Sequence, residues 1–304
     1  MGAYAFSFEI PDFVLTAILV LPFIIAGLAY ALPASAEHRL RRVHSWATEN
    51  VVTLTADVEV MLERVLTWRN RLSGVAMLLL GSLIGATALA WPDFWDSAGL
   101  QPFSLVIVVL VAMTLALSFQ FGQAWLPAGP TRTARPRAVG LADYVPSTLR
   151  TIAWISGATC LAAIALMLGT QPTSWILAAQ CTPQLSVVAA LLFAEWNGRR
   201  AAAKPLPARN EIELYAQDAL RTGLARAGFQ SIALWGGLSL TMLPENLPWP
   251  AWLGVAFEFA GGALLLLSIV ALLLPYPAIN WTRKRLWPRL RPGEYVGLDG
   301  LVLA

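Results

Sequence analysis

Long apolar segments alternate with shorter polar segments along almost the whole chain. A helix needs roughly 20 mostly apolar residues to cross the hydrocarbon core of a bilayer, and seven segments meet this requirement. These predicted membrane spans cover residues 13–33, 73–91, 103–126, 151–170, 174–195, 228–244 and 250–275. The pattern therefore predicts an all-α integral membrane protein with about seven transmembrane helices.

The composition agrees with this class of protein, because 57% of the residues are hydrophobic and only 13% are charged. Soluble domains have about a quarter charged residues, so a single soluble core would leave a large apolar surface in water. The first residues include Glu9 and Asp12 but no Lys or Arg, unlike a cleavable secretory signal peptide. We therefore expect the first apolar segment to be a membrane span.

The basic residues indicate the orientation of the chain. All 21 Lys and Arg residues fall in four segments that a seven-span topology places on one side of the membrane. These segments are 34–72, 127–150, 196–227 and the tail after residue 275. Cytoplasmic loops are enriched in Lys and Arg, so this side is assigned to the cytoplasm. The N-terminus is then outside and the C-terminus is cytoplasmic.

The spacing of the spans predicts a single transmembrane domain over residues 1–304. After the first helix, equivalent spans begin at intervals of about 71 to 78 residues, which gives one helix plus three helical hairpins. True internal repeats would favour a transporter-like bundle. Any protein built of regular hairpins shows the same spacing, so both interpretations remain open.

The cytoplasmic segments 34–72 and 196–227 are predicted to contain amphipathic helices. Apolar residues recur at helical spacing between 50 and 71, and Asn210 followed by Glu213 is typical of a capping box. We interpret these helices as lying on the membrane surface, where Arg side chains meet anionic lipid headgroups. The alternative is that they bind a cytoplasmic protein. The tail after Pro292 is expected to be loosely ordered.

Glu258 is the charged residue within the apolar part of the seventh span. An ionisable group at this depth is costly and marks either a functional site or a buried hydrogen-bonding partner. Gly254, Gly261 and Gly262 lie at helical spacing from it, so a neighbouring helix can approach closely there. We therefore expect the Glu258 carboxyl group to face the interior of the bundle.

The fifth span offers polar groups at a similar depth. Gln180, Thr182 and Gln184 surround Pro183, and a proline inside a helix frees a backbone carbonyl that another group must satisfy. Our hypothesis is that these three residues and Glu258 form a small polar cavity that binds a substrate or carries a proton. The alternative is a neutral glutamic acid that hydrogen bonds between helices and only stabilises the fold.

Other kinds of chemistry find no support in the sequence. The HExxH, P-loop, dinucleotide-binding and GxSxG patterns are all missing. Two histidines, His38 and His44, would lie about 120° apart around a helix, so a shared metal is not expected. Cys160 and Cys181 lie in apolar segments and are expected to act as small hydrophobic residues. We expect no cofactor and no metal, and the topology explains the basic loops without nucleic acid.

Two segments resemble parts of other proteins. The block Leu141–Pro146 (LADYVP) and the segment Gln217–Arg226 (QDALRTGLAR) each precede a predicted span. Both are similar to features of uncharacterised actinobacterial multi-pass membrane proteins. The resemblance implies a bacterial plasma-membrane location, and no activity or residue role follows from it.

These observations favour a non-enzymatic function. The leading interpretation is transport of a small molecule or lipid, or a role as an accessory subunit of a transport system. The first alternative is an intramembrane enzyme that modifies a lipid with Glu258 and the Gln180–Gln184 region. The second is a membrane scaffold or sensor that binds a cytoplasmic protein through its basic loops. The predicted partners are therefore membrane lipids and a cytoplasmic protein, and not nucleic acid.

Overall fold

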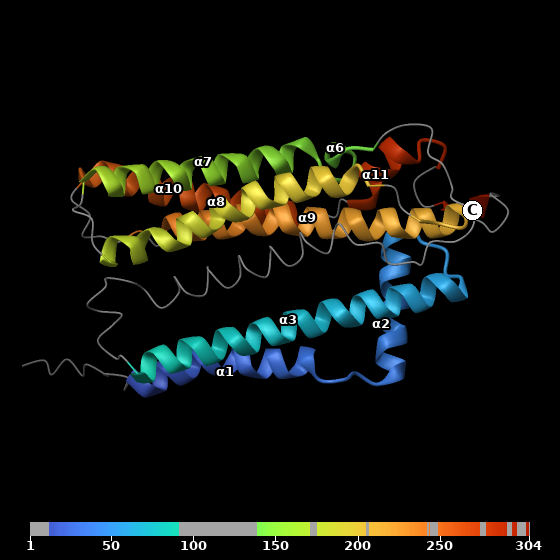
Figure 1. Cartoon of the computed structure of the whole chain (residues 1–304), viewed down its shortest axis with the longest axis horizontal. Helices are drawn as coiled ribbons and strands as arrows, with labels where there is room; N and C mark the ends of the chain where they lie inside the picture. Colours follow the sequence, from blue (N-terminus) through green and yellow to red (C-terminus); the bar gives the residue numbers. More distant parts are fainter. Residues whose placement is uncertain are drawn as a thin grey trace, which may run out of the picture.

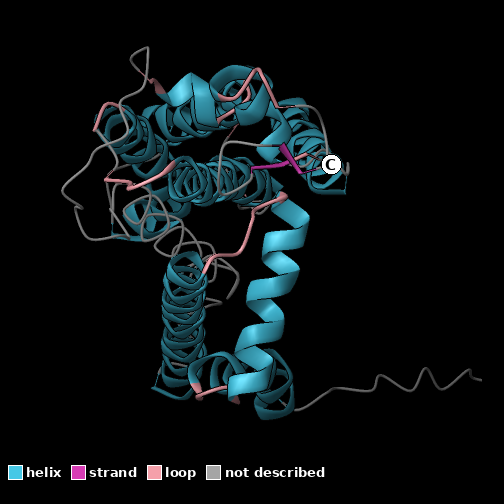
Figure 2. Ribbon diagram, turned by 90° about the vertical axis from the view of Figure 1, so that its right-hand side faces the viewer, coloured by secondary structure: helices cyan, strands magenta, loops and turns pink. Residues whose placement is uncertain are grey.

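A computed structural model gives the structure of the chain and describes residues 12–90, 139–170, 175–204, 207–241, 243, 249–273, 278–290, 294–296 and 302–303. Within these residues the chain is almost entirely helical, with one small two-stranded sheet (Figures 1 and 2). The elements are α1 (Asp12–Ala31), α2 (Ala36–Asn50), α3 (Ala56–Ala90), α6 (Leu141–Tyr144), α7 (Ser147–Thr170), α8 (Trp175–Ala202), α9 (Glu211–Thr241), α10 (Ala251–Leu273), α11 (Ala278–Leu286), β1 (Tyr295–Val296) and β2 (Val302–Leu303). The all-α fold class is confirmed.

Two of these helices, α7 and α10, are long and apolar enough to cross a membrane. The segments Val20–Ala31 and Ala36–Asn50 pass the same test only when taken together, and the chain bends by 93° between them. The described residues thus contain two, or at most three, candidate spans, which indicates a membrane protein. The predicted span 103–126 lies outside the described residues.

Two helices are longer than the sequence pattern predicts. The 35-residue helix α3 and the 31-residue helix α9 each continue without a break from a polar segment into an apolar one. The predicted segment 34–72 therefore contains α2 and the first half of α3, and the predicted segment 196–227 contains the end of α8 and the first half of α9. No proline interrupts either helix, so nothing in the backbone forces it to end at the change in polarity.

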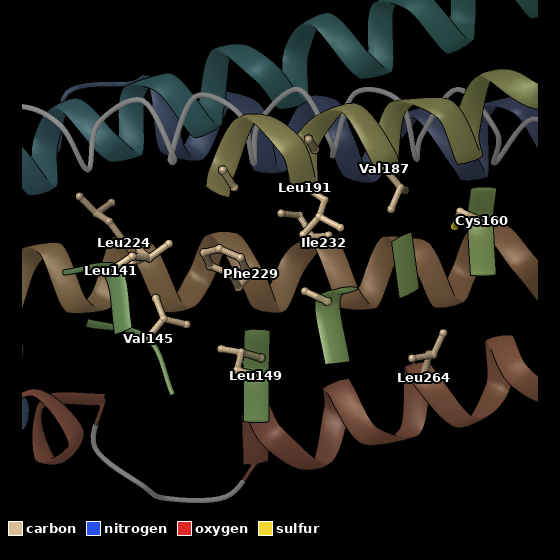
Figure 3. Packing of buried hydrophobic residues seen from close by; sticks show 14 of the residues in the cluster. Leu141, Val145, Leu149, Cys160, Val187, Leu191, Leu224, Phe229, Ile232 and Leu264 are labelled. Atoms are coloured by element: carbon tan, nitrogen blue, oxygen red, sulfur yellow. The ribbon is translucent and has the colours of Figure 1, made fainter. Parts of the chain in front are cut away.

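Helices α7, α8, α9 and α10 form a bundle in which α9 packs against the other three (Figure 1). In the close view of its core, α9 runs between α8 on one side and α10 on the other (Figure 3). Leucine, isoleucine and phenylalanine side chains fill the spaces between these helices, as Leu191, Ile232 and Leu264 illustrate. The interior of the described bundle is therefore a packed apolar core.

Helices α1 and α3 pair through glycines. A methyl group added at Gly27 would lie 2.7 Å from the Leu78 side chain, and one added at Gly74 would lie 2.5 Å from the backbone nitrogen of Ala31. Only glycine leaves room for so close an approach of two backbones, as at many contacts between membrane helices. The α1–α3 pair therefore depends on small residues rather than on interlocking large side chains.

Helix α2 turns away from α1 and joins a second hydrophobic core. The Ser35 hydroxyl caps its first turn by accepting the backbone N–H of His38 at 3.3 Å. It ends at Asn50 and is followed by Val51, whose positive φ of 54° is unusual for a β-branched residue. Val43 and Ala47 of α2 pack with side chains of α3, with the start of α9 and with Val296 of β1.

Residues at the start of α9 confirm the predicted helix cap and show one difference from it. The Asn210 side chain accepts the backbone N–H of Glu213 at 2.9 Å, as a capping residue should. The Glu213 carboxylate, however, reaches back to the backbone N–H of Arg209 rather than to that of Asn210. The carboxylate also pairs with the Arg209 guanidinium at 2.9 Å, which fixes the entry of the chain into the helix.

The described part of the C-terminal tail is held in place, contrary to the expectation of a loose segment. Strand β1 pairs with β2 in antiparallel register, and Val296 is buried. The carbonyl oxygen of Val296 accepts a hydrogen bond from Thr53, and that of Glu294 accepts one from Arg283. The tail therefore connects α11 with the turn between α2 and α3, a link that the polar sequence after Pro292 does not reveal.

Candidate functional site

The Glu258 side chain is exposed on α10 and is not buried against the described helices of the bundle. The buried face of α10 is formed by Phe257, Gly261, Leu264 and Ser268, which recur at helical spacing. Glu258 is one residue beyond Phe257 and is therefore rotated by about 100° from this face. Its carboxyl group points away from the packed core.

The glycines near Glu258 differ in their surroundings. A methyl group added at Gly261 would lie 2.7 Å from the carbonyl oxygen of Gly237, so α9 and α10 are in close contact there. Added methyl groups at Gly254 and Gly262 would meet no atom of the described residues within 4 Å. Gly254, Glu258 and Gly262 are each four residues apart and share one face of α10. That face is open in the described structure.

The polar residues of the fifth span do not converge on Glu258. Gln184 is buried and donates from Nε2 to the carbonyl oxygen of Ser239 on α9 at 3.0 Å. Thr182 is exposed and donates to the carbonyl oxygen of Ala178 in its own helix at 2.8 Å. Gln180 is partly exposed. Gln184 belongs to α8 and Glu258 to α10, and these two helices lie on opposite sides of α9 (Figure 3).

Gln184 belongs instead to a buried polar junction where α7, α8 and α9 meet. The Ser239 hydroxyl donates to the carbonyl oxygen of Gly236 at 2.9 Å and lies 3.5 Å from the Cys160 sulfur. Ser156 of α7 faces the same point, because a methyl group added at Gly236 would lie only 1.8 Å from its hydroxyl oxygen. Short polar side chains that hydrogen bond across helices stabilise membrane bundles, and this junction is too tightly packed to serve as a passage.

The two cysteines belong to hydrophobic clusters of the bundle, and Cys160 also borders the polar junction. Cys160 and Cys181 are both buried and both free, and no disulfide joins them. In the part of the chain that the structure describes, no group of three or more His, Cys, Asp and Glu side chains is placed to hold a metal ion. His38 and His44 lie on α2, separated by less than two helical turns.

A second polar network lies at the basic end of the bundle, between α6, α9 and α11. Asp218 is fully buried and accepts hydrogen bonds from the Tyr144 hydroxyl at 3.1 Å and from the Trp287 indole at 2.9 Å. Thr222 and Thr282 are also buried, and their hydroxyl oxygens lie 2.6 Å apart. We call these five residues the α6–α9–α11 network. It connects residues that are far apart in the sequence.

Aromatic and cationic groups surround this network. The Arg283 guanidinium lies over the Tyr215 ring, 5.6 Å from its centre, and Tyr215 donates its hydroxyl to the carbonyl oxygen of Asn50 at 3.1 Å. Burial raises the pKa of the Tyr215 phenol well above its usual range, while the positive charge of Arg283 opposes that shift. The phenol therefore stays protonated and can donate this bond at physiological pH.

Three residues of this network lie in the two sequence segments that resemble other membrane proteins. Tyr144 lies in the block LADYVP, and Asp218 and Thr222 lie in the segment QDALRTGLAR, the two segments with the recognised resemblance. The structure brings these segments together. Polar residues outside the spans are expected at the surface, and only the fold shows that Asp218 and Thr222 are buried.

An ion-pair cluster fixes α7 to α8 near the same end. Arg150 donates from Nε and Nη2 to the Glu195 carboxylate at 2.8 to 2.9 Å, and the Trp154 indole donates to Oε1 at 3.1 Å. Arg199 of the next turn of α8 pairs with the second oxygen at 3.1 Å. Both oxygens of this buried carboxylate are thus satisfied, so Glu195 has a structural role here.

Comparison with known proteins identifies no family for this chain. No family model, no curated protein sequence and no solved structure matches this chain.

Proposed function

We propose that the chain is a seven-span protein of the bacterial plasma membrane that acts as an accessory subunit of a transport system. In this proposal the N-terminus is outside, the C-terminus is cytoplasmic, and the spans form one helix and three hairpins. The distribution of the 21 basic residues supports the orientation, because Lys and Arg collect on cytoplasmic loops. The length and apolar character of α7 and α10 support membrane insertion.

The observation that carries the accessory role is the exposed carboxyl group of Glu258 on the open face of α10. A charged residue at the centre of a span costs about 2.5 to 3.5 kcal/mol on insertion scales, so such a group normally has a partner. Among the described residues Glu258 has no hydrogen bond or ion pair. Gly254 and Gly262 leave space on both sides of it for a close helix contact.

The partner that fits this face is a transmembrane helix with a hydrogen-bond donor or a basic side chain at the depth of Glu258. A donor would satisfy the carboxyl group, and the two glycines would let the backbones approach. Direct transport of a small molecule or lipid through this chain, or lipid modification at Glu258, would need a polar cavity around the carboxyl group. The packed junction of Ser156, Gly236 and Ser239 favours the accessory role over these alternatives.

Site-specific photo-crosslinking in the native membrane tests the proposal. Val255 is exposed and lies three residues before Glu258, so a photoreactive residue placed there samples the same face of α10. We expect a discrete adduct with another membrane protein. In the Glu258→Ala background the adduct should decrease strongly, whereas Glu258→Gln should retain most of it because an amide still accepts a hydrogen bond.

The matched controls lie on α8. A photoreactive residue at Leu185, which is exposed to a similar extent, should give lipid adducts only. Thr182→Ala removes an exposed polar atom that bonds within its own helix, and it should leave the adduct at Val255 unchanged. Lipid adducts alone at Val255, or a protein adduct that survives Glu258→Ala, would refute the accessory role.

A further inference from the structure

The corner between α1, α2 and α3 forms a half-open cavity of about 790 Å³, which is within the size range of small-molecule sites. The end of α1, the turn into α2, one face of α2 and the first half of α3 contribute to its walls. Figure 1 shows how these three helices are arranged. Four arginines line it: Arg39, Arg42, Arg64 and Arg71. Such a concentration of guanidinium groups favours an anionic ligand.

The positive charge of this cavity is only partly neutralised by the protein. Glu63 is the one acidic residue among the described residues that line it, and it pairs with Arg39 at 2.6 Å. Arg39 also donates from Nη1 to the carbonyl oxygen of Ala34 at 2.7 Å, so two of its three nitrogens already have acceptors. Arg42, Arg64 and Arg71 have no carboxylate partner among the described residues. They leave three positive charges at the cavity.

Arg42 gives an independent sign of a missing ligand. Its Nε atom is buried and has no hydrogen-bond acceptor among the described residues. A buried donor without an acceptor is unfavourable, and burial strengthens the preference for a charged oxygen there. Phosphate oxygens, like carboxylate oxygens, match the planar array of guanidinium donors. The cavity therefore has both the charge and an unused donor for a phosphate group.

The apolar part of the lining indicates that the ligand is an amphiphile. Leu32, Val60 and Trp68 line the cavity and are all more than half exposed. The cavity also lies beside the ends of the predicted spans 13–33 and 73–91, on their basic side. This is the depth of the lipid phosphates in the cytoplasmic leaflet, and Tyr30 and Trp68 are residue types that prefer it.

From this geometry we infer that the α1–α2–α3 cavity binds the phosphate headgroup of an anionic lipid of the cytoplasmic leaflet. Arg42, Arg64 and Arg71 supply the positive charge around the phosphate, and Leu32 and Trp68 contact the start of the acyl chains. The site is separate from the open face of α10. Its existence does not depend on the accessory role.

Lipid binding to the purified full-length chain tests this inference. The probes are dioctanoyl phosphatidic acid, dioctanoyl phosphatidylcholine and inorganic phosphate, with Trp fluorescence as the readout. We expect the anionic lipid to bind and the double variant Arg42→Gln/Arg64→Gln to weaken it about tenfold or more, because two charge-assisted contacts are lost. Arg41→Gln is the matched control, since Arg41 neighbours Arg42 but is exposed and pairs with Glu37. It should change the Kd by less than about twofold.

A variant that binds the anionic lipid more tightly distinguishes a specific effect on the site from misfolding. Glu63→Gln removes the partner of Arg39 and so adds a fourth uncompensated charge, which should tighten the anionic lipid by about threefold or more. Misfolding would not produce tighter binding. Equal weakening by Arg41→Gln, equal affinity for phosphatidylcholine, or inorganic phosphate binding as tightly as the lipid would each overturn the assignment.

Discussion

Trp287 donates its indole N–H to the Asp218 carboxylate at 2.9 Å, and this bond joins the segment after α11 to the first half of α9. The other carboxylate oxygen accepts the Tyr144 hydroxyl of α6, so one buried side chain connects three segments of the chain. The residues joined are 69 and 74 positions apart in the sequence. Asp218 is therefore a central residue of the fold at the basic end of the bundle.

We predict that Asp218→Asn lowers the free energy of unfolding by about 1 to 3 kcal/mol, because an amide can accept only one of the two donated bonds and leaves a buried donor unpaired. Thermal unfolding of the detergent-solubilised protein measures the change. Asp57→Asn serves as the control, since Asp57 is well exposed and pairs with Arg209 at 3.0 Å. That change should be below about 1 kcal/mol. Equal effects of the two substitutions would contradict the role of Asp218.

The close contact between Gly236 and Ser156 leads to a second prediction. Gly236→Ala would place a methyl group 1.8 Å from the Ser156 hydroxyl oxygen and should destabilise the protein by about 1 to 3 kcal/mol. Ser156→Ala removes that oxygen and leaves a contact of 3.1 Å to its Cβ, so the double variant should recover part of the loss. Thermal unfolding of both single variants and the double variant gives the interaction energy.

Gly223 is the matched control for this substitution, because it lies in the same helix and an added methyl group would meet no atom within 4 Å. Gly223→Ala should stabilise the helix by up to about 1 kcal/mol, since alanine has the higher helix propensity. A destabilised Gly223→Ala, or a double variant no better than Gly236→Ala alone, would show that the contact is not the cause.

The buried phenol of Tyr215 predicts a dependence of stability on alkaline pH. Burial raises its pKa in the folded protein above the usual value of about 10, whereas the unfolded chain keeps the usual value. Its contribution is therefore fully present below pH 10 and declines as the pH rises above 10, because only the unfolded state then releases the proton. The slope should approach about 1.4 kcal/mol per pH unit for this group.

Unfolding of Tyr215→Phe and of the unchanged protein between pH 8 and pH 11 tests this dependence. The variant should be less stable at pH 8, because it lacks the hydrogen bond to Asn50, yet it should lose less stability as the pH rises. Parallel pH curves would mean that Tyr215 does not titrate on unfolding.

The pattern of apolar residues was sufficient to predict the helical class and most of the helices. It predicted α7 and α10 and the cap formed by Asn210, because these features depend on residues close together in the sequence. It did not predict that α3 and α9 cross the change from polar to apolar residues without a break. Helix continuity there depends on the absence of a breaking residue and not on polarity.

The position of Glu258 could not be predicted, because nearly every residue of its span is apolar or small and the pattern defines no inner face. The inner face is set by the close contact of Gly261 with Gly237, a property of the packed pair of helices. The burial of Asp218 and Thr222 could not be predicted either, because their partners Trp287 and Thr282 are distant in the sequence. Long-range partners decide whether a polar residue is buried.

The uninterrupted course of α3 has a mechanical consequence. At about 1.5 Å per residue, its 35 residues form a rod about 50 Å long, with Arg64 and Trp68 near its first third. A straight, uninterrupted helix tilts as a rigid unit. A displacement of the end that lines the basic cavity therefore rotates the opposite end of α3 through the same angle. The helix thus couples the cavity mechanically to its far end at Ala90.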